Sequence, residues 1–249
     1  DGTLTTFDVE TGKPVEGTTL GDLPSRSRRG IPVDQRNGRR VEIENDGVII
    51  ATDLSDHSIV TLMPGLKSID TIQLSENGRW LVAINAREGL ACWDLNYPKT
   101  PVIRDDGITA IFSKDNQTLV TTNRNGLVSI FETSTGKKTN HLLLETYATG
   151  SRIALSPDGT LLAVTRGYQD YENLITLIDS QSGKTTGILK GHKQSIWHLA
   201  FSPDGRTLAS SGSGGVIRFW NIATETELLT VDQRGAVIST LTFSPDGRT

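Results

Sequence analysis

The sequence is poor in cysteine, methionine and histidine, and it has no long apolar run. Cys92 is the only cysteine among 249 residues, which excludes a disulfide framework and any metal site built from several cysteines. No segment approaches the ~18 consecutive apolar residues of a membrane-spanning helix. The only methionine is Met63 and the first residue is Asp1, so we expect a segment cut from a longer chain.

Composition and charge narrow the class further. The net charge is −4 with an isoelectric point near 5.6, so strong non-specific binding of nucleic acid by the whole surface is not expected. The apolar fraction is only 35%, whereas the chain contains 25 glycines. This balance favours many short strands and turns over a helical bundle.

One tetrapeptide repeats along the chain. Ser-Pro-Asp-Gly occurs at 156–159, 202–205 and 244–247, and degenerate versions occur at 35–38, 75–78 and 113–116. Each copy lies between two alternating apolar runs. Proline fixes φ at the first corner of a turn, aspartate bonds nearby backbone, and glycine accepts positive φ. Each copy therefore predicts a hairpin turn between two strands.

A second marker has the same period. An acidic residue or asparagine ends a short apolar run at positions 8, 53, 94, 132, 179 and 221, with spacings of 45, 41, 38, 47 and 42 residues. A glycine precedes the first strand of each unit at positions 65, 107, 150, 191 and 235. Both markers repeat about every 43 residues, which is typical of repeat architectures built from four-stranded units.

The unit from Gly191-His192 to Trp220-Asn221 resembles a WD40 repeat, and the other units resemble weaker copies. The resemblance extends over essentially the whole chain. The divergent repeats resemble those of bacterial WD40-repeat arrays. It implies an all-β propeller of four-stranded antiparallel blades, with strands a to d running from the inner edge outward. We expect one domain or propeller segment over 1–249, with five full blades and two half-blades, or six blade positions if the halves pair. The halves are a leading c–d pair and a trailing strand a. The strand order of the family places a strand b at 118–122 and another at 161–165.

The family pattern also implies a buried hydrogen-bond network in each blade. Only Trp93-Asp94 is a literal Trp-Asp pair, and only Gly191-His192 is a literal Gly-His pair. The network is therefore expected to be incomplete, with His192, Ser210 and Trp220 as its candidate members. Most of the other blades are expected to be held together by packing alone.

The chemistry-bearing motifs are weak. Ser182-Gly183-Lys184-Thr185 is similar to the end of a phosphate-binding loop, but the required earlier glycine is replaced by Ile178, so we interpret it as a turn. The four histidines, His57, His141, His192 and His198, fall on separate elements, so no metal site is expected. No nucleophile elbow is present, and Cys92 is expected to be buried and inert.

Arginine on one face of the predicted blades gives the strongest candidate site. We call the face that carries the b–c turns and d–a loops the top, and the face that carries the a–b and c–d turns the bottom. Successive b–c turns contain Arg87, Arg124 and Arg166, and a d–a loop contains Arg26, Arg28 and Arg29. These residues predict a broken basic arc that suits an acidic or phosphorylated peptide. Solvated, charged turns are the alternative interpretation.

The b–c loop at 166–173 is enlarged and carries Tyr168 and Tyr171. Two tyrosines in a surface loop are a plausible contact point for a partner. The alternative is that one or both pack against neighbouring strands.

The predicted function is a non-catalytic scaffold for protein–protein interaction, with partner peptides bound across the top face. No cofactor, nucleic acid or membrane contact is expected, and a cytoplasmic location is predicted. Two alternatives stay open. One is a propeller enzyme of lactonase or quinoprotein type, and the other is a regulatory or spacer module of a signalling protein such as a serine/threonine kinase or NTPase.

Overall fold

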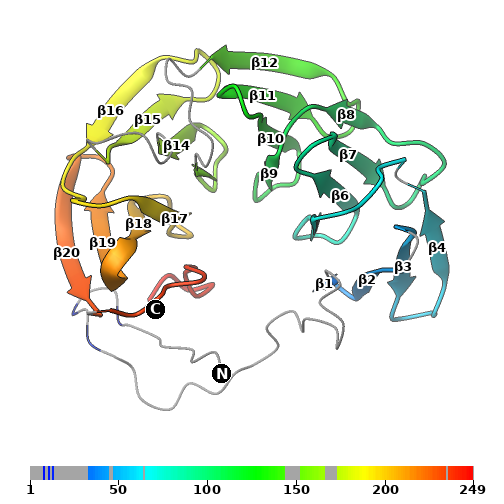
Figure 1. Cartoon of the computed structure of the whole chain (residues 1–249), viewed down its shortest axis with the longest axis horizontal. Helices are drawn as coiled ribbons and strands as arrows, with labels where there is room; N and C mark the ends of the chain where they lie inside the picture. The colour runs from blue at the N-terminus through cyan, green and yellow to red at the C-terminus, as the bar shows by residue number, and fades with distance from the viewer. Residues whose placement is uncertain are drawn as a thin grey trace. The chain divides into compact units, whose positions relative to one another are not determined.

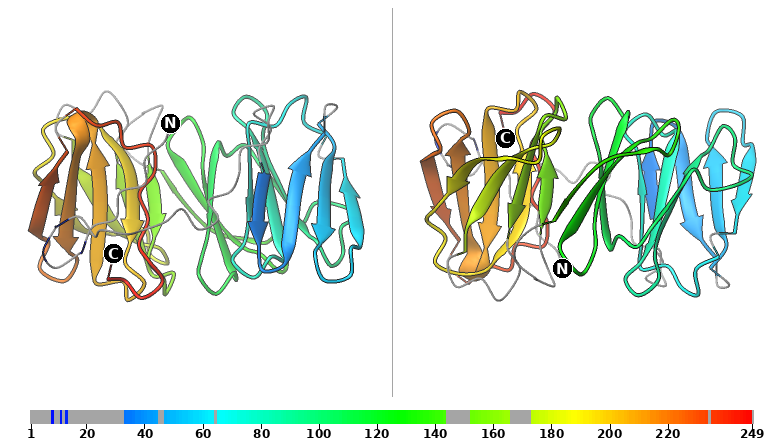
Figure 2. Two further views of the ribbon diagram at one scale, coloured as in Figure 1. Left: turned by 90° about the horizontal axis from the view of Figure 1, so that it is seen from below. Right: turned by 90° about the horizontal axis from the view of Figure 1, so that it is seen from above.

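The described residues form five antiparallel sheets of four strands each (Figure 1). The computed structural model describes residues 8, 11, 13, 33–44, 47–63, 65–143, 152–165, 173–233 and 235–248. Every sheet is a meander in which each strand pairs with its neighbours in sequence. The strands run side by side, and the turns gather at the two ends of each sheet (Figure 2). The chain divides into two compact units.

The first unit, within residues 22–143, contains three sheets. In each, the first strand is strand a and the last is strand d. The sheets comprise β1 Val33–Arg36, β2 Arg39–Ile43, β3 Ile49–Asp53 and β4 Ile59–Leu62; β5 Thr71–Leu74, β6 Trp80–Asn85, β7 Gly89–Asp94 and β8 Ile103–Asp105; and β9 Thr109–Phe112, β10 Thr118–Thr122, β11 Leu127–Glu132 and β12 Lys138–Leu143.

The second unit contains two sheets and the C-terminal residues. A single short 3-10 helix, η1 Ser213–Gly215, is the only helix among the described residues and forms the b–c turn of the last sheet. The strands are β13 Ile153–Leu155, β14 Leu161–Thr165, β15 Ile175–Asp179 and β16 Thr185–Leu189; and β17 Ile196–Phe201, β18 Thr207–Gly212, β19 Val216–Asn221 and β20 Thr226–Asp232.

These five sheets are the five full blades that the repeats predict. The expected strand b of the third sheet, 118–122, and strand b of the fourth, 161–165, coincide with β10 and β14. The expected trailing strand a is wrong in detail. Residues 236–243 form no strand, although Ile238, Leu241 and Phe243 pack on the last sheet, because a strand needs a pairing partner and none is described beside them. The strands of the expected leading half-blade lie outside the described residues, and only Asp8, Thr11 and Lys13 of its c–d turn are described.

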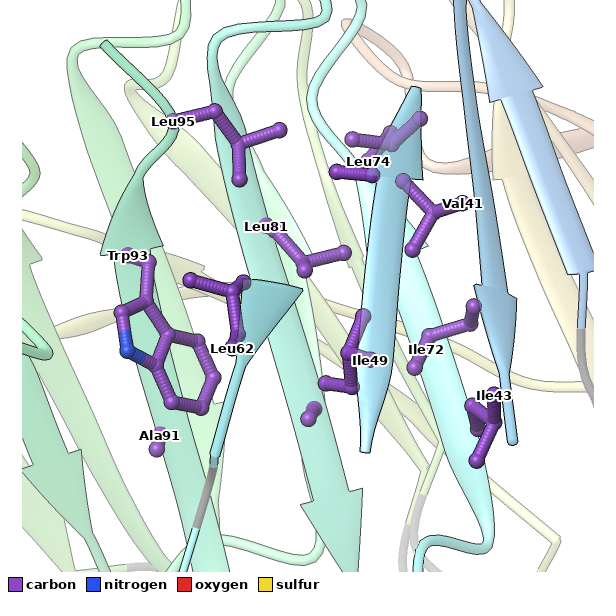
Figure 3. Close-up of a cluster of buried hydrophobic side chains, with 12 residues drawn as sticks. Val41, Ile43, Ile49, Leu62, Ile72, Leu74, Leu81, Ala91, Trp93 and Leu95 are labelled. Carbon is purple, nitrogen blue, oxygen red and sulfur yellow. The ribbon is translucent and has the colours of Figure 1, made fainter. Parts of the chain in front are cut away.

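The hydrophobic core lies between neighbouring sheets within each unit. Side chains of the first sheet face those of the second: Val41 lies beside Leu74, Ile43 beside Ile72, and Leu62 beside Trp93 (Figure 3). The β6 and β7 strands are buried along their whole length because sheets cover both of their faces. This arrangement explains why their sequences read as nearly continuous apolar runs rather than as alternating ones.

The a–b turns are held by a repeated set of hydrogen bonds. In the Ser202–Gly205 turn, the Ser202 hydroxyl donates to Asp204 Oδ1 at 2.6 Å and accepts from the Thr207 amide at 2.9 Å. Gly205 has φ of +73°, which only glycine adopts readily. The turns beginning at Ser75, Ser113, Ser156 and Ser244 share the serine-to-Asp or serine-to-Asn bond. Hydrogen bonds therefore hold the a–b turns in shape, in addition to the packing expected inside the blades.

The c–d turns explain the second sequence marker. The Asp179 carboxylate accepts hydrogen bonds from both the amide and the hydroxyl of Ser182, and these bonds lower the pKa of Asp179. Related bonds form in three other c–d turns: Asp8 accepts from the amide and hydroxyl of Thr11, Asp53 accepts from those of Ser55, and Glu132 accepts from the hydroxyl of Thr135. The Ser182–Thr185 segment is thus the turn between β15 and β16, as interpreted, and not a phosphate loop.

Candidate functional site

Two of the predicted arginines lie on adjacent top turns of the first unit. Arg87 is exposed on the turn between β6 and β7, and Arg124 is exposed on the turn between β10 and β11. The Arg124 guanidinium donates two hydrogen bonds, of 2.9 and 2.7 Å, to the carbonyl oxygen of Ala86. Because Ala86 directly precedes Arg87, these bonds tie the two turns together.

Carboxylates accompany these arginines. Asp70 accepts from the Ala86 amide, Asp106 accepts from the Asn123 side chain, and Glu88 accepts from the Lys67 amide. Each of these carboxylates stabilises a top turn or loop by accepting a hydrogen bond from a backbone or side-chain amide. The arc is therefore a mixed-charge surface in this unit and not a continuous cationic patch.

The other predicted partner residues fall in segments without a described position. Arg26, Arg28, Arg29, Arg166, Tyr168 and Tyr171 lie outside the described residues. The enlarged b–c loop and the arginine-rich loop therefore remain predictions from sequence.

The structure brings His192, Ser210 and Trp220 together in the last sheet. His192 Nε2 lies 2.7 Å from Ser210 Oγ, and Trp220 Nε1 donates to the same hydroxyl at 2.8 Å. All three side chains are buried. Burial, with a smaller contribution from Arg218, lowers the pKa of His192 to about 4. His192 is thus a neutral hydrogen-bonding group that joins the d–a loop to strands b and c.

A second network, which the sequence reasoning missed, occupies the third sheet. The Thr121 hydroxyl donates to Asp105 Oδ2 at 2.6 Å, and Lys138 Nζ lies 3.2 Å from Asp105 Oδ1. By strand register Thr121 corresponds to Ser210, because both lie two residues after the leucine that pairs with Phe131 or Trp220. The available signal was this hydroxyl at the equivalent position of strand b. The acidic partner, Asp105, belongs to the preceding sheet, so a comparison of equivalent positions between repeats does not reveal it.

The described residues offer neither a candidate metal site nor a reactive thiol. They contain no group of three His, Cys, Asp or Glu side chains that could hold a metal ion. Cys92 is buried, and burial together with the nearby Asp94 charge raises the pKa of its thiol far above the ordinary value. Within the described part of the chain no helix has the length and apolar character needed to cross a bilayer.

Comparison with known proteins extends these observations. Residues 183–221 match the family model described as WD domain, G-beta repeat. The chain is 24% identical over 152 residues to antiviral protein SKI8 of Saccharomyces cerevisiae, covering 54% of this chain and 38% of that protein. It is 30% identical over 111 residues to WD repeat and SOCS box-containing protein 1 of Homo sapiens, covering 45% and 26%.

A third relative covers more of the chain. Autophagy-related protein 18 of Dictyostelium discoideum is 33% identical over 180 residues, covering 68% of this chain and 44% of that protein. The chain thus spans less than half the length of each of these three relatives. All three come from eukaryotes, so they lend no support to the predicted bacterial style. The matched repeat, the WD-repeat relatives and the five four-stranded sheets together support a place for this chain in the WD40-repeat family.

Proposed function

We propose that this chain is a non-catalytic scaffold that binds segments of other proteins across its top face. The observation that supports it most is the pair of exposed arginines, Arg87 and Arg124, on two turns that the bonds from Arg124 to Ala86 hold together. Loops on a rigid sheet scaffold commonly carry binding residues. The relationship to other WD-repeat proteins supports the general role of a protein-interaction scaffold.

The finer part of the proposal concerns the partner. Guanidinium groups bind carboxylates and phosphates through paired hydrogen bonds, so the partner segment is acidic or phosphorylated. The mixed charges around the arginines restrict such a segment to positions where its anions meet Arg87 and Arg124 rather than Asp70 or Glu88. The pattern of charges on this surface therefore sets the position at which the partner segment binds, in addition to attracting it.

Affinity capture followed by mass spectrometry tests the proposal. The variant Arg87→Glu/Arg124→Glu reverses two top-face charges, and Lys99→Glu/Lys114→Glu reverses two exposed charges on bottom turns as a matched control. We expect the captured partners to be lost from the first variant and kept by the second, and phosphatase treatment of the lysate shows whether phosphate is required. If adding Arg166→Glu to the first variant still leaves the captured set unaltered, the top-face site is wrong.

A further inference from the structure

One strand a differs from all the others in its pairing. In the last sheet Ile196 pairs with Gly212 and His198 pairs with Ser211, so Trp197 is an extra residue in a β-bulge. The corresponding a–b pairs of the other four described sheets continue without a shift. Bulges turn a side chain away from its regular position and are frequent beside binding and active sites.

The bulge holds an exposed tryptophan in a fixed position. The Trp197 side chain is 40% exposed, whereas Trp80, Trp93 and Trp220 are 3, 2 and 1% exposed. Its indole Nε1 donates to Ser213 Oγ at 2.7 Å, and its carbonyl oxygen accepts from Arg152 Nε at 2.8 Å. The polar edge of the indole and the carbonyl are thus satisfied, while apolar ring surface faces solvent. Tryptophan presented in this way binds at low entropic cost, because little freedom remains to be lost.

The surroundings of Trp197 are cationic. Arg152, before β13, reaches across from the neighbouring sheet to the bulge, and Lys193 is exposed on the d–a loop that leads into β17. The neighbouring His198 forms a hydrogen bond with the Ser211 hydroxyl, with 2.9 Å between Nδ1 and Oγ. Burial lowers the pKa of His198, and the Arg152 charge lowers it further. The charged side chains described beside the bulge, Arg152 and Lys193, are therefore both cationic. A cationic side chain stacked on the indole would be repelled, whereas a carboxylate beside it would be attracted.

We propose that Trp197 is the apolar anchor of a docking site for an extended protein segment that carries a large apolar side chain next to an acidic residue. The apolar side chain packs on the exposed face of the indole, and the carboxylate lies toward Arg152 and Lys193. This inference rests on the proposed scaffold function and specifies the chemistry of its partner on the second unit.

Selection from a phage-displayed library of random linear peptides tests the proposal. We expect the selected peptides to combine an aromatic or large aliphatic residue with neighbouring Asp or Glu. Trp197→Ala should weaken their binding at least about 30-fold, the minimum for a hot-spot residue, and Arg152→Gln should weaken acidic peptides selectively. Tyr97→Ala removes another exposed aromatic, 75% exposed on a bottom turn of the first unit, and should leave binding unchanged.

Tryptophan fluorescence gives an independent measurement on the same complexes. Since the other three tryptophans are buried, acrylamide quenches Trp197 selectively, and a bound peptide should protect it. Basic selected peptides, or equal affinity for wild type and Trp197→Ala, would overturn the inference. Peptides that instead lose binding in Arg87→Glu/Arg124→Glu would leave the scaffold function intact and refute only the Trp197 site. A library that yields no binder would refute both.

Discussion

Ser210→Ala should strongly destabilise the second unit. The indole of Trp220 can only donate, so Ser210 Oγ accepts its hydrogen, and the same hydroxyl also forms a hydrogen bond with Nε2 of neutral His192. The substitution leaves two buried polar atoms without that partner, on side chains that are 1% and 7% exposed. An unsatisfied buried group costs roughly 1–3 kcal/mol. With two such groups the expected loss is about 2–6 kcal/mol of the free energy of unfolding, against a typical total of about 5–15 kcal/mol.

Urea unfolding followed by tryptophan fluorescence measures this loss, because Trp220 is part of the network. The two compact units can unfold in separate transitions, so the comparison uses the transition that the substitution shifts. Ser211→Ala is the matched control. Ser211 is equally buried, but its hydroxyl bonds only the half-buried His198, which water can reach. We expect the control to lose at most about 1 kcal/mol.

A conservative variant separates the hydroxyl from side-chain size. Ser210→Thr keeps the hydroxyl, as Thr121 does at the equivalent position of the third sheet, and should retain most of the stability. Equal losses for Ser210→Ala and Ser211→Ala would refute the reasoning, since the network would then contribute no more than an ordinary hydrogen bond.

Three further predictions concern the same scaffold. The pKa of His192 is about 4 in the fold against an ordinary value of 6.5, so the stability that neutral His192 contributes should be present above pH 6.5 and be lost progressively toward pH 4, by roughly 3 kcal/mol. The urea midpoint should therefore fall less over this pH range in His192→Asn than in the wild type, and an equal fall would contradict the prediction. Gly136→Ala places a Cβ 2.2 Å from a backbone carbonyl at φ +68°, whereas Gly38→Ala at φ +74° meets nothing within 4 Å, so thermal unfolding should show a much larger loss for Gly136. Thr121→Val leaves one oxygen of Asp105 without its hydroxyl partner and should cost about 1–3 kcal/mol, measured by urea unfolding with Thr121→Ser as the variant that retains the bond.

The repeat chemistry made most of the fold predictable. Turn residues and alternating runs are local signals, and they located strands such as β10 and β14 to the residue. The network of His192, Ser210 and Trp220 could also be predicted, because all three residues belong to one repeat, and they are hydrogen bonded in the structure.

The remaining features depend on contacts between repeats or on irregular pairing. Asp105 accepts a hydrogen bond from Thr121 of the next sheet, and the sequence of neither repeat alone predicts that pair. Trp197 occupies a position where the alternating pattern predicts a regular strand residue, and only the actual pairing shows the bulge. Local patterns cannot report an extra residue in one strand, because register is set by both strands together.

The meander order of every sheet has a consequence for how the chain acquires its structure. Each strand pairs with the strand that precedes or follows it in sequence, so the ladder contacts have short sequence separation and a small entropy of loop closure. A sheet can therefore assemble as soon as its own four strands have left the ribosome, without waiting for distant sequence. Contacts between sheets, such as Asn37 to Asn77 and Arg124 to Ala86, then add one neighbour at a time, as expected for a vectorial, repeat-by-repeat folding process.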